Sequence, residues 1–595
     1  MTTNPPRWTL DEWFSGVEDT PYVDEFSACM AAVAALETRL TDLKGSDHFE
    51  VESWARFLVD MEAWESRIQH LGAFVGCSAA ADSANPTLRS EGARLSGLRA
   101  VYSGLDGAVG AHLATLPEAD FAALVARPSL ADCQHRLETA RIRSGRRMRP
   151  EQEKLAGALG VDGLSAWGRL YAELTGDLTF ETHDGETVPL AWRRSILQSP
   201  DRAARAQALA GSTGALASQG HVFASALNAI SGARLTLQEW RGGVHVIDEA
   251  AFDAQIERGT LDAMLKAAEA NRELPRRYLG LKARLLGVER LDFADLTAPL
   301  PLGDSVTFGW EEAKGLVLES FDRYHADLGD FAREMFDRGF IEAEPRVGKR
   351  AGAFCSSSRI RKESRVFMSF RGTAGDVRTL GHELGHAYHN YVLRGARGWA
   401  SGYPMTLAET ASIFAETLVT EALLERPGLS RGQKAQILGS RLESAVTYIL
   451  NIPMRFEFER DLYAARANGT LSASQICDLM ADTQRRVYGS GLDPDGVDPW
   501  FWAWKLHFFL THTLFYNFPY TFGYLFSLGV KEKAKAEGYA AFHETYVALL
   551  QGTATARAEP LAQRMLGVDI GQEAFWQSSI DGIAEALTQF EALLD

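Results

Sequence analysis

Cysteine is scarce and scattered in this sequence. The five cysteines among 595 residues are Cys29, Cys77, Cys133, Cys355 and Cys477. No two of them form a CxxC pair, which excludes the usual zinc-ribbon and redox-disulfide patterns. An odd number of isolated thiols also argues against a disulfide-stapled secreted protein. The opening residues, MTTNPPRWTLDEW, show no basic region followed by an apolar one, so we expect a cytoplasmic protein.

Positive charge is in short supply. Lys and Arg number 61 against 78 Asp and Glu, which gives a net charge of -17. A protein of this charge repels phosphate backbones and anionic lipid, so neither nucleic acid nor a membrane surface is an expected partner. Hydrophobic residues make up 46% of the chain, enough for a large buried core.

Long apolar runs are absent, with one exception. His507 to Val530 reads HFFLTHTLFYNFPYTFGYLFSLGV. About 20 apolar residues suffice to cross a bilayer. However, this run contains His507, His512, Asn517 and Pro519, and unsatisfied polar groups are costly in hydrocarbon. We therefore predict a buried segment and no membrane span.

Strand patterns are also rare, and helical periodicity dominates. A hairpin is predicted over Leu178 to Leu190, where Asp184 and Gly185 separate two β-prone runs. A second strand is predicted in ESRVFMSF, residues 363–370. We predict a mainly α protein, divided near residue 195 into a helical N-terminal region (1–195) and a catalytic domain (196–595). Apolar residues at helical spacing predict helices over Phe26 to Leu43, Trp54 to Leu71, Leu155 to Leu174, Arg202 to Ile230, Phe252 to Leu286, Trp310 to Phe340 and Gly432 to Asn451.

One motif carries chemistry. Residues 373–392 read TAGDVRTLGHELGHAYHNYV and contain HExxH. On a helix, His382 and His386 share one face about 5 to 6 Å apart, within reach of one tetrahedral cation, and Glu383 can lean toward a water on that cation. The alternative is a helix whose two histidines only pack or hydrogen-bond.

A catalytic zinc ion needs a third protein ligand. Glu409, in MTLAETASIFAETLV, is the best candidate. Thr406-x-x-Glu409 also fits a capping box, in which Glu409 would only satisfy a backbone N–H, and the residues alone leave both readings open. His389 lies about 10 Å along the helix from His382, too far for one ion to bind both.

Three stretches of the sequence resemble those of a known protein family. GHELGHAYHNY, LAETASIFAE and HFF…FYNFPYTFGYLFSLG resemble the thimet oligopeptidase and oligoendopeptidase F family of zinc metallopeptidases, nearest the oligoendopeptidase F branch, from about residue 120 onward. The resemblance implies one Zn²⁺ per chain held by His382, His386 and Glu409, which favours the metal over the cap. It further implies that Glu416 orients a ligand histidine. The implied fold is a bowl-like helical metallopeptidase with a deep substrate channel and a small β element beside the HExxH helix.

The resemblance also assigns the apolar run near the C-terminus. In the family this segment forms a wall opposite the zinc, with a histidine and tyrosines that contact the substrate carbonyl and a glycine at a flexing point. Phe518 stands where relatives often carry another tyrosine. The matching positions in this sequence are His507, Tyr516, Tyr520, Tyr524 and Gly523.

The residues of this segment fit such a wall. Pro519 suits the first turn of a helix and disfavours helical geometry at the residue before it. Tyr520 and Tyr524 then share one helix face, while Phe522 and Phe526 form a second stripe suited to the core. Any single tyrosine could instead pack in the core, because aromatic stripes commonly do so.

The predicted function is a zinc-dependent oligoendopeptidase that hydrolyses internal bonds of short unstructured peptides, with Glu383 as the general base. The strand before the zinc helix could offer an edge to which a peptide adds. A zinc carboxypeptidase on a related helical scaffold is the nearest alternative, and a peptide-binding protein with a structural metal is another. The substrate-binding residues predicted on the strand are Arg365, Val366, Phe367, Met368 and Ser369.

Overall fold

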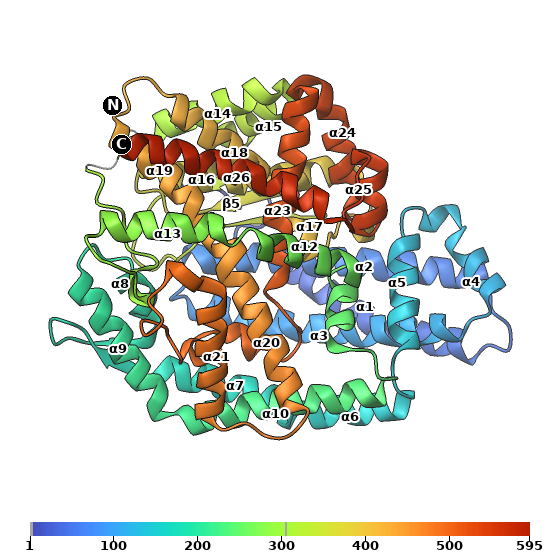
Figure 1. The fold of residues 1–595 in the computed structure, drawn as a ribbon. Coiled ribbons are helices and arrows are strands. Elements are labelled where there is room, and N and C mark those ends of the chain that lie inside the picture. The colour runs from blue at the N-terminus through green and yellow to red at the C-terminus, as the bar shows by residue number, and fades with distance from the viewer. Residues whose placement is uncertain (1–3, 304–305) are drawn as a thin grey trace. The chain divides into compact units, whose positions relative to one another are not determined.

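The structure is a computed structural model that describes residues 4–303 and 306–595, and Figure 1 shows its elements. It is mainly helical with two small sheets, as predicted. The chain forms two compact units that alternate along the sequence. Unit 1 comprises Met1–Arg147, Ser305–Pro427 and Val530–Val568, and unit 2 comprises Met148–Asp304, Gly428–Gly529 and Asp569–Asp595. A division at residue 195 stays a prediction.

Unit 1 is built on a long, strongly buried helix, α2. Its apolar positions, such as Trp54, Met61 and Trp64, lie in the core of the N-terminal helices, as their spacing predicts. The helices of this unit are α1 (Thr20–Gly45), α2 (Val51–Ala81), α3 (Pro86–Thr115), α4 (Glu118–Val125), α5 (Gln134–Gly145), α14 (Trp310–Tyr324), α15 (Ala326–Asp337), α16 (Ala374–Val392), α17 (Met405–Ala408), α18 (Thr410–Glu425), α24 (Tyr539–Gly552) and α25 (Ala558–Leu566).

Unit 2 contains the predicted hairpin, in which β1 (Thr179–Glu181) pairs with β2 (Thr187–Pro189) in antiparallel register. A π-helical turn, η6 (Val446–Asn451), leads directly into α20. Helix α23 (Phe518–Glu537) belongs to this unit as far as Gly529. The other helices are α6 (Pro150–Asp162), α7 (Leu164–Asp177), α8 (Arg193–Ile196), α9 (Arg202–Ser218), α10 (Gly220–Trp240), α11 (Val246–Asp253), α12 (Arg258–Ala270), α13 (Glu273–Leu285), α19 (Arg431–Ala445), α20 (Ile452–Arg466), α21 (Ala473–Tyr488), α22 (Phe501–Trp504) and α26 (Glu573–Leu594).

Four of the long predicted helices are interrupted in the structure. The stretch predicted over Leu155 to Leu174 breaks at Gly163, and the one over Arg202 to Ile230 breaks at Gln219. The stretch predicted over Trp310 to Phe340 breaks at His325, which ends α14 and caps α15. The ring of His325 accepts a hydrogen bond from the backbone of Asp327 (3.2 Å). Phe252 to Leu286 divides into the end of α11 and the helices α12 and α13. Apolar spacing continues across such breaks because the helices on both sides bury residues in the core.

The sheet beside α16 has the strand order β3-β5-β4. Its strands are β3 (Ile341–Glu342), β4 (Phe354–Ser358) and β5 (Glu363–Phe367). β5 therefore has a hydrogen-bonded neighbour on each side, parallel β3 and antiparallel β4. The prediction that residues 363–370 offer a free edge to a peptide is wrong, because the backbone groups of β5 are already paired. In this sheet β4 is an edge strand.

The side chains predicted to bind substrate on β5 and the residues after it are mostly buried. Arg365 is fully buried, donates from Nε to the carbonyl of Thr9 (3.2 Å) and lies over the ring of Phe340. Its packing is structural, so the prediction that it binds substrate is not supported. Three neighbours are buried and the last is half-buried: Val366, Phe367, Met368 and Ser369.

Helix α16 begins at a capping box. The hydroxyl of Thr373 accepts from the backbone N–H of Asp376 (3.1 Å), and the carboxylate of Asp376 accepts from the backbone of Thr373 (3.0 Å). β5 ends six residues before this cap, so the HExxH helix follows the sheet directly.

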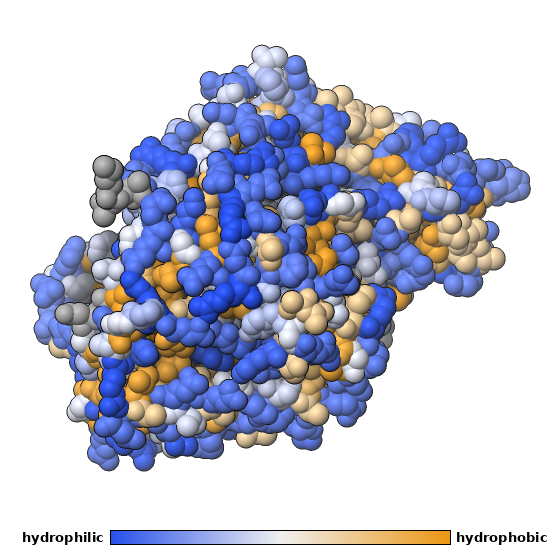
Figure 2. Space-filling model, turned by 90° about the horizontal axis from the view of Figure 1, so that it is seen from above, coloured by the Kyte–Doolittle hydropathy of each residue, from blue (hydrophilic) through white to orange (hydrophobic). Residues whose placement is uncertain are grey.

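The apolar run near the C-terminus is no membrane span. Within residues 4–303 and 306–595, no helix is long and apolar enough to cross a bilayer. On the face drawn in Figure 2, hydrophobic residues occur in small groups among hydrophilic ones.

Candidate metal centre

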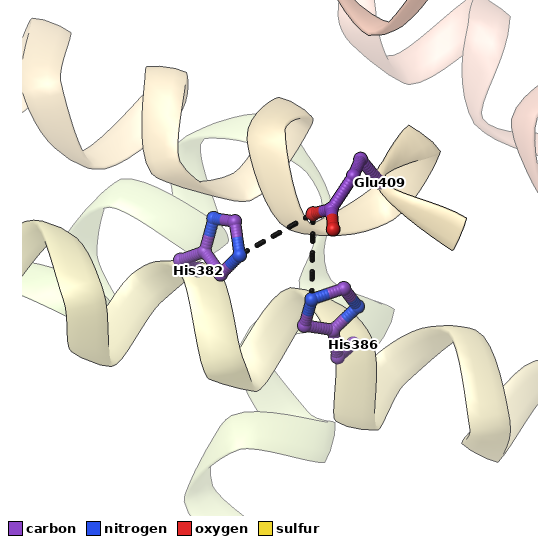
Figure 3. A group of neighbouring side chains, drawn as sticks. All are labelled: His382, His386 and Glu409. Atoms are coloured by element: carbon purple, nitrogen blue, oxygen red, sulfur yellow. Dashed lines mark ion pairs between the residues drawn. The ribbon is translucent and has the colours of Figure 1, made fainter. Parts of the chain in front are cut away.

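Two helices of unit 1 bring three metal-ligating side chains together. His382 and His386 project from successive turns of α16, with ring centroids 4.9 Å apart. Glu409 stands between α17 and α18 and turns its carboxylate toward both rings, as Figure 3 shows. Its Oε2 lies 3.4 Å from Nε2 of His382 and 3.5 Å from Nε2 of His386. Ligand atoms of the three residues all lie within 4.8 Å of one another.

The capping box that Thr406 and Glu409 could form is absent. Glu409 occupies the N-cap position of α18, yet its side chain makes no capping hydrogen bond. Instead, Oε2 of Glu409 accepts a hydrogen bond from the hydroxyl of Ser412 (2.6 Å). The carboxylate therefore faces the two histidines and is held there by Ser412.

The ring of His382 is oriented through the nitrogen that faces away from Glu409. Nδ1 of His382 lies 2.9 Å from Oε2 of Glu416, and Arg378 binds the other oxygen of that carboxylate. A proton on Nδ1 of His382 leaves the Nε2 lone pair directed at the site, as a metal ligand requires.

Charges at this site shift two pKa values strongly in the metal-free chain. Burial alone would lower the pKa of His382, but the hydrogen bond and charge of Glu416, followed by Glu409, raise it to about 9. Burial would raise the pKa of Glu416, but Arg378 and His382 lower it to about 2. Glu416 is therefore a firmly ionised acceptor for the His382 ring.

Glu383 follows His382 on α16 and is bonded to none of these groups. It is 5% exposed, and its Oε2 has no hydrogen-bond partner in the described part of the chain. Burial, assisted by the charges of Glu409 and Glu416 and opposed by His382, raises its pKa to about 7. A buried carboxylate oxygen without a partner, beside a His–His–Glu donor set, fits a site that holds a divalent ion and a water.

Two glycines allow α16 and α18 to approach closely. A Cβ atom on Gly385 would lie 2.5 Å from the carbonyl oxygen of Ala411 and 2.7 Å from Cα of Ser412. A Cβ atom on Gly381 would lie 2.7 Å from a methyl group of Val419. Glu409 reaches the histidines because α18 begins in this close contact.

We expect Gly385→Ala to lower both the melting temperature and the metal affinity. The new methyl group meets backbone atoms that can only move with α18, and overpacking of this kind costs about 1 to 3 kcal/mol. Gly375→Ala in the first turn of α16 is the matched control, because its Cβ would approach only the hydroxyl of Thr373, at 3.5 Å. A Gly385→Ala protein that melts and binds zinc like the control would contradict this account.

A cavity of about 960 Å³ in unit 1 opens beside α16 and β4. Ala387 and Asn390 line it from the helix face that also carries Glu383, one and two turns further on. Ser357 and Ser358 of β4 line it as well. The volume is in the range of ordinary ligand pockets.

His389 is not part of the ligand set. It is fully buried, its Nε2 bonds to the hydroxyl of Thr553 (2.9 Å), and its ring stacks on Tyr403 with centroids 4.0 Å apart. As the spacing along the helix predicts, its role is structural.

The predicted wall residues lie together in unit 2. Nδ1 of His507 donates to Oδ1 of Asn517 (2.7 Å), and its ring meets the ring of Tyr516 at 4.8 Å. The hydroxyl of Tyr520 donates to that of Tyr516 (2.9 Å). Burial lowers the pKa of His507 to about 4 despite its bond to Asn517, so the ring is neutral near pH 7.

The remaining residues of the segment belong to α23 and are mostly buried. Pro519 is its second residue, so the helix begins one residue earlier than predicted, at Phe518. Phe522 and Phe526 stack on each other, and Phe522 packs on Trp576, as predicted for a core stripe. Tyr524 is 5% exposed and stacks on Tyr448, so its ring packs mainly in the core. Gly523 is a buried position in the middle of the continuous helix.

A buried carboxyl group holds the loop before α23. Oε1 of Glu459, which is 3% exposed, accepts from the backbone N–H of Phe515 (3.0 Å), a residue in the left-handed region (φ 47°). Burial, opposed by Arg234, raises the pKa of Glu459 to about 7. Because its folded-state pKa lies above the unfolded value, the stability it contributes is complete below about pH 4.5 and is lost as the pH rises through 7.

We therefore expect Glu459→Gln to stabilise the protein at pH 8 and to have little effect near pH 5. The amide keeps the acceptor for Phe515 and removes the cost of ionisation, worth up to about 3 kcal/mol. The measurement is the melting temperature of the variant and the wild type across this pH range, with the exposed Glu289→Gln as control. A difference that does not change with pH would contradict the assignment.

Sequence reasoning missed some of the residues that shape the sites. Arg378 neutralises Glu416 and lies four residues before His382, so the spacing of four along α16 could have identified it. Arg455, whose Nη1 donates to Asn517 beside His507, follows the π-helical turn and had no such signal.

Comparison with known proteins adds to the geometry. The profile of Peptidase family M3 matches residues 195–575, and that of Oligopeptidase F matches residues 112–180. The chain is 25% identical over 338 residues to the chromosomal oligoendopeptidase F of Lactococcus lactis subsp. cremoris, covering 56% of this chain and 54% of that protein. It is 26% identical over 463 residues to the Group B oligopeptidase PepB of Streptococcus agalactiae serotype III, covering 75% and 74%.

The fold also matches solved structures. The structure of oligoendopeptidase-F from Enterococcus faecium aligns with a TM-score of 0.71 at 20% identity, covering 97% of this chain and 99% of that one. A protein from Chlamydophila abortus aligns with a TM-score of 0.80, also at 20% identity, covering 99% and 98%. The chain spans about half the length of the Lactococcus relative (54%) but nearly all of these two folds. Since the profile of Peptidase family M3 matches well over half of the sequence, this chain belongs to that family.

Proposed function

We propose that this protein is a zinc-dependent oligoendopeptidase that hydrolyses internal bonds of short unstructured peptides. The observation that carries the proposal is the placement of Glu383 beside the His382, His386 and Glu409 group, with a buried free oxygen and a pKa of about 7. Membership of Peptidase family M3 and the names of the relatives, oligoendopeptidase F and oligopeptidase, support the same activity.

His382, His386 and Glu409 would hold the ion. Two imidazoles and one carboxylate are a donor set typical of catalytic zinc, and one coordination position stays open. A bound zinc ion supplies Lewis acidity, which lowers the pKa of water in the site and polarises a carbonyl oxygen. Glu416 and Arg378 keep His382 in the tautomer that such binding needs.

Glu383 moves the proton. Its carboxylate takes a proton from the attacking water and later passes it to the leaving amine nitrogen, so that the peptide C–N bond breaks as a C–O bond forms. A pKa of about 7 suits both steps, because the group can accept and release a proton near neutral pH.

We assign the oxyanion donor to a tyrosine rather than to His507. With its Nδ1 proton donated to Asn517, the neutral His507 ring has only an acceptor left at Nε2. Tyr516 accepts from Tyr520, and its own hydroxyl proton can point toward a developing oxyanion. The proposal includes that these residues contact the substrate carbonyl.

The peptide would add to β4 rather than to β5. β4 pairs only with β5 in its sheet, and two of its residues line the cavity beside α16. Backbone pairing along this edge would bind peptides without strict demands on their side chains. The five cysteines are all unpaired, which supports a reducing, cytoplasmic setting.

The test is mass spectrometry of end-blocked peptides incubated with purified protein, with and without a chelator. Internal cleavage that stops on chelation and returns with zinc is expected. Release of C-terminal residues from free peptides alone would indicate a carboxypeptidase instead. Binding of peptides without cleavage by the zinc-loaded protein would refute a peptidase function.

A further inference from the structure

Three positively charged side chains of unit 2 lack a carboxylate partner. Arg194, Arg455 and Lys505, here called the cationic cluster, form no ion pair within residues 4–303 and 306–595. Their neighbour Arg193 differs, since it is buried and bound to the carboxylate of Asp498. The cluster therefore has more positive charge than the protein around it neutralises.

Arg455 is the most costly of the three to leave unpaired. Its side chain is 9% exposed, and its Nη1 donates to Oδ1 of Asn517 (3.2 Å). Its second terminal nitrogen donates to the amide oxygen of Asn451, and its Nε has no partner in the described part of the chain. Neutral amides do not neutralise a guanidinium, and a buried charge without a counter-ion is unfavourable.

The other buried cations of this protein have carboxylate partners or a larger set of hydrogen-bond acceptors. Arg234 lacks a carboxylate too, but it donates to the backbone carbonyls of Leu510 and Thr513 and to the hydroxyl of Tyr463. The other buried lysines and arginines are each paired with a carboxylate: Arg193 with Asp498, Arg205 with Asp295, Arg272 with Glu457, Lys282 with Glu443, Arg365 with Glu363, and Lys531 with Glu421.

Two aromatic rings are shared between Lys505 and the neighbouring guanidinium groups of Arg455 and Arg193. Nζ of Lys505 lies 5.2 Å from the ring centre of Phe501, and the guanidinium of Arg455 lies 5.4 Å from the same ring. Nζ of Lys505 is also 5.9 Å from the ring of Trp504, over which Arg193 lies at 5.4 Å.

The local field around Lys505 is strongly positive. Burial and then repulsion by Arg455, Arg194 and Arg193 hold the pKa of Lys505 well below its usual range. Asp498 opposes this effect, but its carboxylate is already bound by Arg193. Positive charges gathered on apolar walls attract an anion from solution.

The cluster is positioned by irregular helix geometry. The π-helical turn η6 ends at Asn451, one turn before Arg455 on the continuing helix. Asn451 bonds to Arg455 through its oxygen and donates from Nδ2 to the hydroxyl of Tyr488 (2.8 Å). Single π-helical turns occur frequently at functional sites.

The position of the cluster indicates which anion it takes. Nη1 of Arg455 lies 3.4 Å from Nδ1 of His507, and Lys505 precedes that histidine by two residues. Under the proposed function, the residues next to His507 contact the substrate. The anion available to the cationic cluster is therefore one carried by the peptide itself.

We propose that Arg194, Arg455 and Lys505 bind a carboxylate of the peptide substrate, either its C-terminal group or an acidic side chain. This inference rests on the proposed function and names a substrate class for it. Cleavage is then fastest when a carboxylate lies at a fixed distance along the peptide from the scissile bond.

The test compares pairs of peptides competing for the enzyme. One pair shares a cleavable sequence and differs only in a C-terminal carboxylate or carboxamide. A second set keeps the carboxamide and replaces Gln by Glu at each position in turn. The ratio of kcat/KM within a pair, measured by mass spectrometry, does not depend on how much of the enzyme is active.

The wild type should prefer the carboxylate partner of one of these pairs by about 10- to 100-fold, as charged hydrogen bonds allow. Lys505→Met should bring the ratio close to one, and Lys505→Arg should retain much of the preference. Arg194→Met should lower the ratio less, because this side chain is exposed. Lys154→Met, a matched change at an exposed lysine of α6, should leave the ratio unchanged.

The pair that shows the preference identifies the source of the carboxylate. A preference confined to the first pair assigns the C-terminal group, and one confined to a single Glu position assigns a side chain. Equal cleavage within every wild-type pair, or a preference that survives in Lys505→Met, would overturn the inference while the peptidase function stands. No cleavage of any peptide by the zinc-loaded wild type would overturn both.

Discussion

Glu383→Gln should lower kcat by about 10²- to 10⁴-fold and leave the metal content unchanged. The amide has the shape of the carboxylate but cannot take a proton from water. Glu383 does not contribute to the His382, His386 and Glu409 group, so the ion should bind as before. The measurements are single-turnover hydrolysis of a blocked peptide and metal content of the purified variant.

The control for this variant is Glu425→Gln. This exposed carboxylate lies at the end of α18 and pairs with Arg323 on the surface. It makes the same chemical change on a neighbouring helix and should leave turnover unaltered. Near-normal hydrolysis by Glu383→Gln would exclude Glu383 as the general base.

Glu409→Gln should abolish zinc-dependent activity, and added zinc should not restore it. An amide oxygen carries no charge, so the site would lose the one anionic ligand of its donor set. The loss should be visible as weaker zinc binding in competition with a chromophoric chelator. It should also appear as a lower melting temperature in the presence of zinc, because bound ligand stabilises the folded state.

Glu416→Gln provides the comparison, because the carboxylate of Glu416 bonds to the ring of His382 and to Arg378 and is not part of the His382, His386 and Glu409 group. Loss of such an orienting partner typically costs about 10- to 100-fold in metal affinity. Activity of this variant should therefore recover when zinc is in excess. If Glu409→Gln recovered in the same way, Glu409 would not be a ligand.

The HExxH helix and the core were predictable because their signals are local. His382 and His386 define one face by their spacing, and the capping residues Thr373 and Asp376 fix where α16 begins. The spacing of Phe522 and Phe526 likewise predicts a core stripe, which the structure confirms.

The third ligand could not be decided from the residues alone. A capping box and a metal ligand both place Glu409 at the start of a helix, so the local pattern is the same. What distinguishes them is the approach of α18 to α16, which depends on Gly381 and Gly385 meeting residues about 30 positions further along the chain.

The strand prediction failed for a similar reason. Alternation in residues 363–370 identifies a strand but carries no information about its neighbours. β3 has only two residues and β4 reads FCSSS, so neither had a pattern strong enough to predict that β5 is flanked on both sides. Likewise, the sequence cannot show that Arg455 lacks a carboxylate partner, because the residues around it come from distant parts of the chain.

The alternation of the two units along the chain has a consequence for biosynthesis. Unit 1 needs Val530–Val568 and unit 2 needs Asp569–Asp595, so unit 1 is incomplete until Val568 has been translated and unit 2 until the segment after it has followed. At ordinary elongation rates, roughly half a minute to two minutes pass before that point. During this time the helices already made expose apolar faces that await later segments. We therefore expect nascent chains that stop at Gly529 to be bound by ribosome-associated chaperones and removed by proteolysis, since neither unit is complete in them.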